Sequence, residues 1–138
     1  MLSAMQPSDY PFCVLLVEDQ EIILENIRQQ LIDNGFEVIA ASSAEEACVQ
    51  IARHGERIGA AFLDVDLGEG EDGFCVARQV RAAQPDAKIV YTSGGIRGGL
   101  LNERVENSVF VPKPYMPSQI GFLLCDMLSL VRTEADNH

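Results

Sequence analysis

The stretch "GAAFLDVDLGEGEDG" (residues 59–73) begins as an apolar run and ends in a cluster of carboxylates. Its apolar half is typical of a β-strand that is covered on both faces. Asp64 ends the run, and four more acidic residues follow before the last glycine: Asp66, Glu69, Glu71 and Asp72. Two like charges about 4 Å apart repel each other by roughly 4 kcal/mol at an intermediate dielectric. These carboxylates therefore either point into water or share a cation.

Apolar strands and amphipathic helices alternate along the rest of the chain. We expect strands at residues 12–17, 36–41, 58–63, 88–93 and 108–111. Helices are expected after each strand, at about 18–35, 43–51, 74–83, 100–106 and 118–131. Five alternations predict an α/β domain, with a flavodoxin-like, doubly wound, five-stranded parallel sheet of order 2-1-3-4-5 and helices on both faces.

Short polar signals mark several of the expected helix ends. Ser43 and Glu46 have the spacing of a capping box, and Pro85 closes the third helix. Ser118 can cap the last helix, after three prolines that break the chain at 112, 114 and 117. We expect a single domain over residues 12–131, between a flexible N-terminal segment (1–11) and a polar tail (132–138).

The composition excludes several classes of function. A formal net charge of -11 and a pI near 4.4 argue against direct nucleic-acid binding, which depends on Lys and Arg. Such an acidic balance fits a protein that meets cations or basic patches on other proteins. The opening residues lack the pattern of a signal peptide and no apolar run is as long as a membrane span, so we expect a cytoplasmic location.

The four cysteines point to free thiols rather than to a metal site. They are Cys13, Cys48, Cys75 and Cys125. None forms a C-x-x-C pair, and the two histidines, His54 and His138, have no metal-like spacing relative to them. Cysteines spread through apolar segments indicate buried thiols in a reducing compartment.

Polar side chains follow the strands at the edge where ligands bind in open parallel sheets. Glu18 and Asp19 follow the first strand and Asp64 follows the third. In the order 2-1-3-4-5 these strands are neighbours at the switch point, so the three carboxylates converge. Mg²⁺ is the hard cation that prefers one or two carboxylates plus waters and a phosphate. Thr92 and Lys113, at the ends of the fourth and fifth strands, would complete a receptacle for a phosphoryl group on a carboxylate.

With these motifs in order, residues 12–131 resemble the receiver domain of bacterial two-component response regulators. The matching pieces are "VEDQ", "LDVDL" with the later "DG", "IVYTSG" and "VPKPY". The resemblance implies that Asp64 accepts a phosphoryl group and that Thr92 and Lys113 bind its oxygens. It also implies a Mg²⁺ site formed by Glu18, Asp19, Asp64 and the backbone carbonyl of Asp66. Thr92 and Phe110 would then transmit the change as switch residues, and Lys113–Pro114 would be a cis bond.

The resemblance further implies a signalling switch rather than an enzyme, although such domains can catalyse their own phosphorylation and dephosphorylation. The phosphodonor would be a histidine kinase or a histidine phosphotransfer protein. A downstream protein would bind the surface formed by the fourth helix, the fifth strand and the fifth helix. We expect no direct contact with nucleic acid or membrane, and either a monomer or a phosphorylation-dependent dimer.

Several alternatives stay open. Asp64 and Asp66 are both candidate acceptors from position alone, and it is the family pattern that selects Asp64. Gly68 stands where the family usually has proline, and the acidic loop is altered, so a degenerate receiver acting as a constitutive interaction module is one rival. A nucleotide- or flavin-binding enzyme is another, but "VEDQEII" lacks the phosphate loop that it needs. The chain could act alone, since no output domain is expected after residue 131, or be a receiver from a larger sensor kinase.

Overall fold

A computed structural model describes residues 12–68, 72–94 and 103–136 of the chain. Five parallel strands form one sheet in the order β2-β1-β3-β4-β5, which confirms the predicted fold. The strands are β1 (Cys13–Val17), β2 (Glu37–Ala41), β3 (Ile58–Asp64), β4 (Lys88–Ser93) and β5 (Ser108–Pro112). The bounds predicted for each strand lie within two residues of these. The prediction succeeds because a parallel strand that is buried on both faces has a continuous run of apolar residues.

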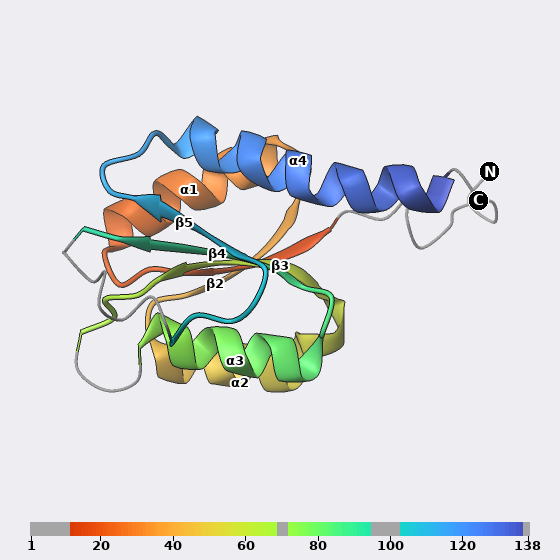
Figure 1. Cartoon of the computed structure of the whole chain (residues 1–138). Helices are drawn as coiled ribbons and strands as arrows, with labels where there is room; N and C mark the ends of the chain where they lie inside the picture. The colour runs from red at the N-terminus through yellow and green to blue at the C-terminus, as the bar shows by residue number, and fades with distance from the viewer. Residues whose placement is uncertain (1–11, 69–71, 95–102, 137–138) are drawn as a thin grey trace.

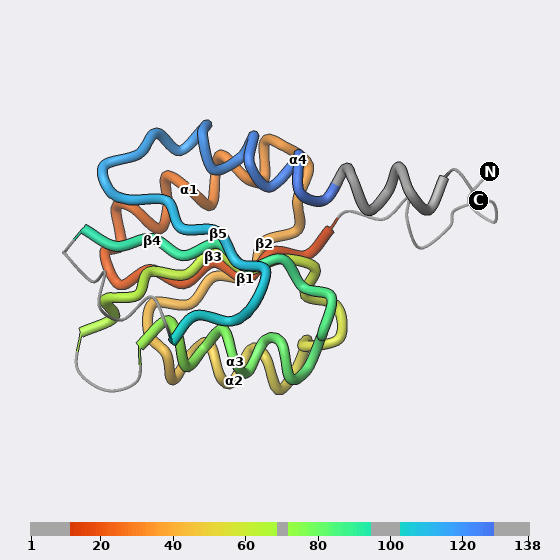
Figure 2. The backbone as a smooth tube through the Cα atoms, in the orientation of Figure 1, coloured from red at the N-terminus to blue at the C-terminus, as the bar shows by residue number. Residues whose placement is uncertain are grey.

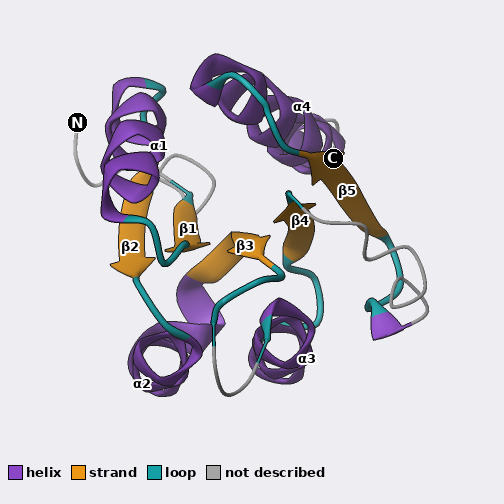
Figure 3. Ribbon diagram, turned by 90° about the vertical axis from the view of Figure 1, so that its left-hand side faces the viewer, coloured by secondary structure: helices purple, strands orange, loops and turns teal. Residues whose placement is uncertain are grey.

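Helices cover both faces of the sheet, as Figure 1 shows. The helices are α1 (Glu21–Asp33), α2 (Ala44–His54), a short 3₁₀ turn at Gly55–Arg57, α3 (Gly73–Ala83) and α4 (Pro117–Asp136). Helices α1 and α4 lie on one face, and α2 and α3 lie on the other; the tube in Figure 2 shows the same two layers. Viewed along the strands, Figure 3 places the sheet between them.

Two apolar clusters fill the space between the sheet and its helices. The cluster under α2 and α3 includes Leu15, Leu63 and Tyr91, and the cluster under α1 and α4 includes Leu16, Phe62 and Val90. Neighbouring residues of a strand thus contribute to opposite clusters, as the two-residue period of a strand requires. This alternation decides which face each strand-end side chain joins.

The helix N-termini show which capping predictions were right. The Ser43 hydroxyl accepts a hydrogen bond from the Glu46 N–H at 3.1 Å, as a capping box requires. The Glu46 carboxylate, however, accepts from the N–H and the hydroxyl of Ser42 rather than closing on Ser43. Asp72, which the sequence places in the acidic loop with Glu69 and Glu71, caps α3 by accepting from the Cys75 N–H at 3.1 Å. Glu69 and Glu71 lie outside the described residues.

The C-terminal third departs most from the expectation. The last helix begins at Pro117, so Ser118 is its second residue and not its cap. Proline suits the first helical position because its fixed φ is already helical and its missing N–H would have no partner there. The helix continues to Asp136, beyond the expected end at residue 131. Of the helix expected at 100–106, the described residues 103–106 form no α-helix, and residues 100–102 lie outside the described part.

The four cysteines form no disulfide bonds, as predicted. Cys13 is buried, whereas Cys48, Cys75 and Cys125 are only half-buried. Burial raises the pKa of the Cys13 thiol to about 11, which keeps it protonated at neutral pH. In the parts of the chain that are described, no helix is both long and apolar enough to cross a membrane.

Gly73 allows α3 to begin directly against the end of β3. A Cβ atom at this position would lie 2.5 Å from the carbonyl oxygen of Asp64 and 3.0 Å from the Cα of Val65. Both are backbone atoms, which cannot rotate out of the way. Gly73 also donates its N–H to the Val65 carbonyl at 3.2 Å, which ties the helix start to the strand end.

We predict that Gly73→Ala destabilises the protein by about 2 kcal/mol, within the range of overpacked core positions. The added methyl must push α3 away from β3. Urea unfolding followed by circular dichroism measures the change. Gly94→Ala is the matched control, because among the described residues its Cβ would meet only the flexible Lys113 side chain, at 3.5 Å. Equal stabilities for the two variants would contradict the prediction.

Candidate functional site

The predicted site residues meet at the carboxyl end of the sheet. Glu18 follows β1, Asp64 ends β3, Thr92 lies near the end of β4 and Lys113 follows β5. Each comes two residues after a side chain of the core under α1 and α4: Leu16, Phe62, Val90 and Val111. The same alternation that builds this core therefore brings four polar side chains to one face and one edge.

Three carboxylates form the centre of the crevice. Ligand oxygens of Glu18, Asp19 and Asp64 all lie within 4.8 Å of one another. Glu18 is 2% exposed and Asp64 is 1% exposed, whereas Asp19 faces solvent. So close a group of buried anions needs a counter-charge, because neither water nor distance screens their repulsion.

Lys113 supplies that counter-charge. Its ammonium donates to Asp64 Oδ2 at 2.8 Å and to Glu18 Oε1 at 3.2 Å. The backbone supplies further donors: the Asp66 N–H binds Asp64 Oδ1 at 2.8 Å and the Asp19 N–H binds Glu18 Oε2 at 3.0 Å. The four oxygens of the two buried carboxylates are thus each held in a fixed direction.

The charges in the crevice shift the proton affinities of its groups. Burial, together with the hydrogen bond and charge of nearby Asp64, raises the pKa of the Glu18 carboxyl to about 8, although Lys113 opposes the shift. Burial alone would lower the pKa of Lys113, but its contacts with Asp64 and Glu18 outweigh that effect and raise it. At neutral pH the crevice therefore holds a charged ammonium and a carboxyl group that is easily protonated.

Thr92 provides a hydroxyl with no partner. It is 1% exposed, and within the described structure its Oγ1 has no hydrogen-bond partner. A buried hydroxyl without a hydrogen-bond partner destabilises the folded state by about 1–3 kcal/mol. A ligand oxygen that accepted a hydrogen bond from this hydroxyl would remove that cost. Thr92 is the register partner of Asp64 across β3 and β4, which puts the hydroxyl on the strand beside the carboxylate.

Sequence reasoning missed one contact at the mouth of the crevice. The Ser93 hydroxyl donates to Asp66 Oδ2 at 2.6 Å. The sequence does not indicate that Ser93 and Asp66 lie in contact, because the contact joins the loop after β3 to the end of β4. The pair fixes the Asp66 side chain beside the crevice while its N–H binds Asp64.

Two aromatic residues flank the site. Phe110 is half-buried on β5 and packs against the core under α2 and α3. Tyr115, which the sequence analysis did not single out, packs edge-on against Phe62 with ring centroids 5.5 Å apart. Its hydroxyl is buried with no partner among the described residues, and burial with the charges of Glu18 and Asp64 raises its pKa. Lys113–Pro114, between them, is a cis bond as the resemblance implied.

The altered loop begins at a residue that only glycine accommodates easily. Gly68 has φ +78°, in the left-handed region. Proline is locked near φ –65° and could not take this conformation. Glycine in place of the family's usual proline thus lets the backbone take a different path at this position. Residues 69–71, which complete the loop, lie outside the described part.

The fold and its acidic crevice define the class of CheY-like receiver domains. Residues 14–124 match the response regulator receiver domain, and the chain belongs to that family. Such domains are phosphoacceptor signalling domains of two-component systems rather than enzymes. Receiver domains bind Mg²⁺ at an acidic pocket, and Glu18, Asp19 and Asp64 form such a cluster here. They interact with histidine kinases and with downstream effectors.

Named relatives agree with this assignment. The chain is 38% identical over 119 residues to the alginate biosynthesis transcriptional regulatory protein AlgB of Pseudomonas aeruginosa, covering 85% of this chain and 26% of AlgB. It is 28% identical over 117 residues to the sensor kinase CckA of Brucella abortus, covering 83% of this chain and 12% of CckA. The chain thus spans about a quarter or less of the length of these two relatives.

Solved structures agree as well. A response regulator receiver protein from Sinorhizobium medicae superposes with a TM-score of 0.78 at 29% identity, over 86% of this chain and 95% of that one. A CheY-like receiver domain protein from Methanospirillum hungatei gives a TM-score of 0.75 at 23% identity, over 90% and 98% of the two chains. The second likeness supports the fold alone.

The raised pKa of Glu18 predicts how stability depends on pH in the absence of divalent metal. The folded protein holds this proton to about pH 8, whereas an unfolded chain loses it near the ordinary value of 4.5. The stabilising contribution is therefore complete below the ordinary pKa and is lost as pH rises to about 8. Urea midpoints measured in EDTA should fall from about pH 5 to about pH 8.

Glu18→Gln is the control for this prediction. Glutamine keeps the shape of the protonated side chain but cannot titrate, so its midpoints should fall less over the same range. A wild-type stability that rises through this range would contradict the assignment of the proton to Glu18.

Proposed function

We propose that this chain is a phosphorylation switch in a two-component phosphorelay, with Asp64 as the phosphoacceptor. The observation that carries the proposal is the setting of Asp64. Its carboxylate is almost fully buried at the end of β3, bound by Lys113 at 2.8 Å and adjacent to Glu18 and Asp19. Asp66 is the weaker candidate, because its side chain is committed to Ser93 at the mouth of the crevice.

The proposed reaction is a transfer from phosphohistidine to carboxylate. An Asp64 oxygen attacks the phosphorus of a phosphohistidine on a histidine kinase or a histidine phosphotransfer protein. The P–N bond breaks, its electron pair stays on the imidazole, and an acyl phosphate forms on Asp64. Lys113 then pairs with a phosphoryl oxygen, and the free Thr92 hydroxyl donates to another.

Magnesium fits the donors that the chain offers. Glu18, Asp19, Asp64 and the backbone carbonyl of Asp66 would hold the ion, all through the oxygen ligands that Mg²⁺ prefers. Bound there, it would neutralise charge on the phosphoryl oxygens during transfer. The raised pKa of Glu18 supports a cation in this place, because a divalent ion would relieve the same repulsion that a proton relieves.

The response would pass through the switch residues Thr92 and Phe110 to a downstream protein. Thr92 pairs with Val111 in the β4–β5 register and Phe110 is the residue before it, so a movement at Thr92 reaches β5 directly. The proposed partner surface comprises β5, α4, which is the fifth helix that the sequence predicts, and the region of the predicted fourth helix, of which residues 103–106 are described. Val109 on β5 and Phe122 on α4 are 37% and 69% exposed, which suits a protein contact.

Other features of the proposal follow from the family. The receiver would occupy residues 12–131, act in the cytoplasm as a monomer or a phosphorylation-dependent dimer, and contact neither nucleic acid nor membrane itself. It could accelerate its own phosphorylation and dephosphorylation. The relatives include a transcriptional regulatory protein and a sensor kinase, so the chain could serve either as a regulator or as the receiver of a hybrid kinase.

Asp64→Asn should abolish phosphoryl uptake from acetyl phosphate in the presence of Mg²⁺. The amide keeps the shape of the side chain but is not a nucleophile. Mass spectrometry of the intact protein measures uptake, and peptide mapping locates the modified residue. Asp86→Asn carries the same substitution at the opposite end of the sheet and should be phosphorylated like the wild type.

The outcomes separate the proposal from its rival. Uptake by Asp64→Asn would show that the acceptor is a different residue. No Mg²⁺-dependent uptake and no spectral change with beryllofluoride in the wild type would instead favour a degenerate receiver that acts as a constitutive interaction module.

Ser93→Ala should shorten the lifetime of the acyl phosphate several-fold, up to about tenfold, which corresponds to about 1.4 kcal/mol in the barrier. The substitution releases the Asp66 carboxylate from its 2.6 Å contact and so opens the crevice to water. Loss of labelled phosphate after removal of the donor measures the rate. Ser118→Ala, on α4, is the matched control. An unchanged lifetime in Ser93→Ala would show that the contact does not control water access.

A further inference from the structure

Strand β5 delivers Lys113 to the site, yet it is the least secured strand of the sheet. Among the described strands it pairs with β4 alone. Of its five residues only Val111 is buried. An edge strand with so little buried surface is easily frayed or shifted. Something other than core packing must hold β5 in place if Lys113 is to stay 2.8 Å from Asp64.

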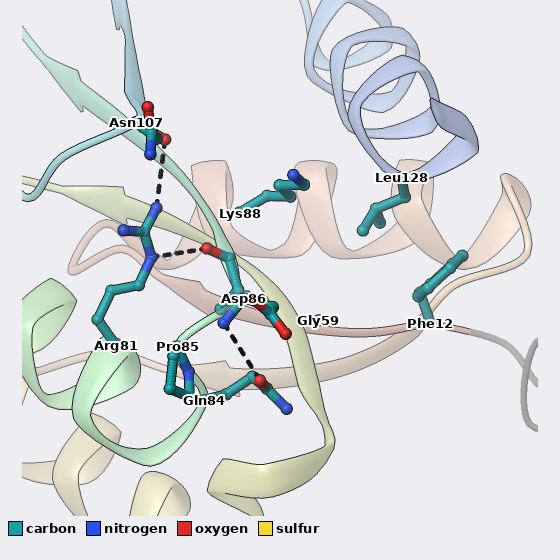
Figure 4. Close-up of a pocket in the computed structure, with 10 residues that line it drawn as sticks. Phe12, Gly59, Arg81, Gln84, Pro85, Asp86, Lys88, Asn107 and Leu128 are labelled. Carbon is teal, nitrogen blue, oxygen red and sulfur yellow. Dashed lines mark hydrogen bonds between the residues drawn. The ribbon is translucent and has the colours of Figure 1, made fainter. Parts of the chain in front are cut away.

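Arg81, near the C-terminus of α3, holds the chain just before β5. Its guanidinium donates to three backbone carbonyls: Nε to Ala87 at 2.7 Å, Nη1 to Glu106 at 2.7 Å and Nη2 to Asn107 at 3.2 Å. Figure 4 shows the side chain extended toward Asn107, among the residues that line a surface cavity. The Ala87 carbonyl immediately precedes β4, so one side chain ties the starts of both strands to α3.

Tyr91 holds the same segment from inside the sheet. It is fully buried on β4, and its ring packs against Phe74 of α3 with centroids 5.0 Å apart. Its hydroxyl accepts a hydrogen bond from the Val105 N–H at 3.1 Å. The Ser108 hydroxyl donates to the Val105 carbonyl at 2.7 Å, which closes the turn onto the first residue of β5.

Arg81 and Tyr91 therefore fix the amino end of β5, while Lys113 acts at its carboxyl end. A parallel strand advances about 3.3 Å per residue, so a slip of even one residue would move Lys113 farther than its hydrogen bond to Asp64 is long. A slip of one residue would also turn every side chain of β5 to the opposite face. The pairing register of β5 at its amino end therefore determines whether Lys113, at its carboxyl end, can reach Asp64.

We propose that Arg81 and Tyr91 are positioning residues for Lys113: they anchor the amino end of β5 and so set the reach of the ammonium into the acceptor crevice. The inference rests on the proposed function, because it assigns to Lys113 the pairing of phosphoryl oxygens. Arginine suits this role through its planar fork of donors. A lysine at this position has one flexible ammonium and could not hold three carbonyls from two segments.

The test uses the fact that the chain has only two lysines, Lys88 and Lys113. A brief pulse of acetic anhydride followed by peptide mapping gives the acetylation rate of Lys113 relative to Lys88. A lysine held against two carboxylates reacts slowly, and it reacts faster when that pairing loosens. Phosphorylation by acetyl phosphate with Mg²⁺ is measured on the same samples.

Arg81→Lys and Tyr91→Phe are the informative variants. In each variant we expect acetic anhydride to acetylate Lys113 about three- to tenfold faster than in the wild type. Phosphorylation should slow by a similar factor, because the same loosened contact of Lys113 controls both rates. Arg78→Lys is the matched control: the same substitution on an exposed position of the same helix, with wild-type rates expected. If Arg81→Lys fails to fold, Tyr91→Phe still decides the question.

Unchanged Lys113 acetylation in both variants would overturn the proposal, even if their stability or phosphorylation fell, because the two residues would then be merely structural. Faster acetylation with undiminished phosphorylation would overturn it as well. The labelling needs no phosphoryl transfer. A wild type that takes no phosphate at Asp64 would defeat the proposed function, while the acetylation ratio would still report whether the anchor holds Lys113.

Discussion

The contact between Lys113 and the buried carboxylates is the constraint on which this molecule depends. Asp64 and Glu18 are both removed from water, and burial together with the neighbouring Asp64 raises the pKa of the Glu18 carboxyl. The ammonium, at 2.8 and 3.2 Å from their oxygens, offsets part of this cost. It does so incompletely, since the pKa of Glu18 stays raised to about 8. The crevice therefore carries less positive charge than its carboxylates require, and it can accept a further cation.

The sheet itself creates that shortage. Side chains of a strand alternate between its faces, so the residue two positions beyond a core residue projects to the same side. Leu16, Phe62, Val90 and Val111 build one core, and the next residues in this alternation are the four polar groups of the crevice. The same packing that excludes water from the core also shields the first polar layer above it. Stability and reactivity therefore have a common cause in the strand period.

Much of this arrangement could be predicted from the sequence, because continuous apolar runs fix the parallel strands and their order fixes which ends meet. Glu18, Asp64, Thr92 and Lys113 were placed together on that basis. What escaped prediction depends on contacts between loops and between helices. Asp72 reads as one more charge in an acidic loop, and only the path of the chain makes it the cap of α3. The start of α4 at Pro117 was misjudged because a serine next to a proline resembles a cap whichever of the two begins the helix.

Glu18, which follows β1, and Thr92, on β4, lie on opposite sides of Asp64, and the two sides of the crevice lack different partners. Near Glu18 the crevice has too much negative charge, which a cation would correct. Near Thr92 it has a hydroxyl donor that finds no acceptor among the described residues, and an anionic oxygen would supply one. A divalent cation alone would satisfy the first side and a phosphoryl group alone the second. Only the two together satisfy both, and in the proposed reaction Asp64 is the group between them, bonded to the one and coordinating the other. Under the proposed function, a phosphorylated Asp64 together with a divalent ion would satisfy both sides of the crevice at once.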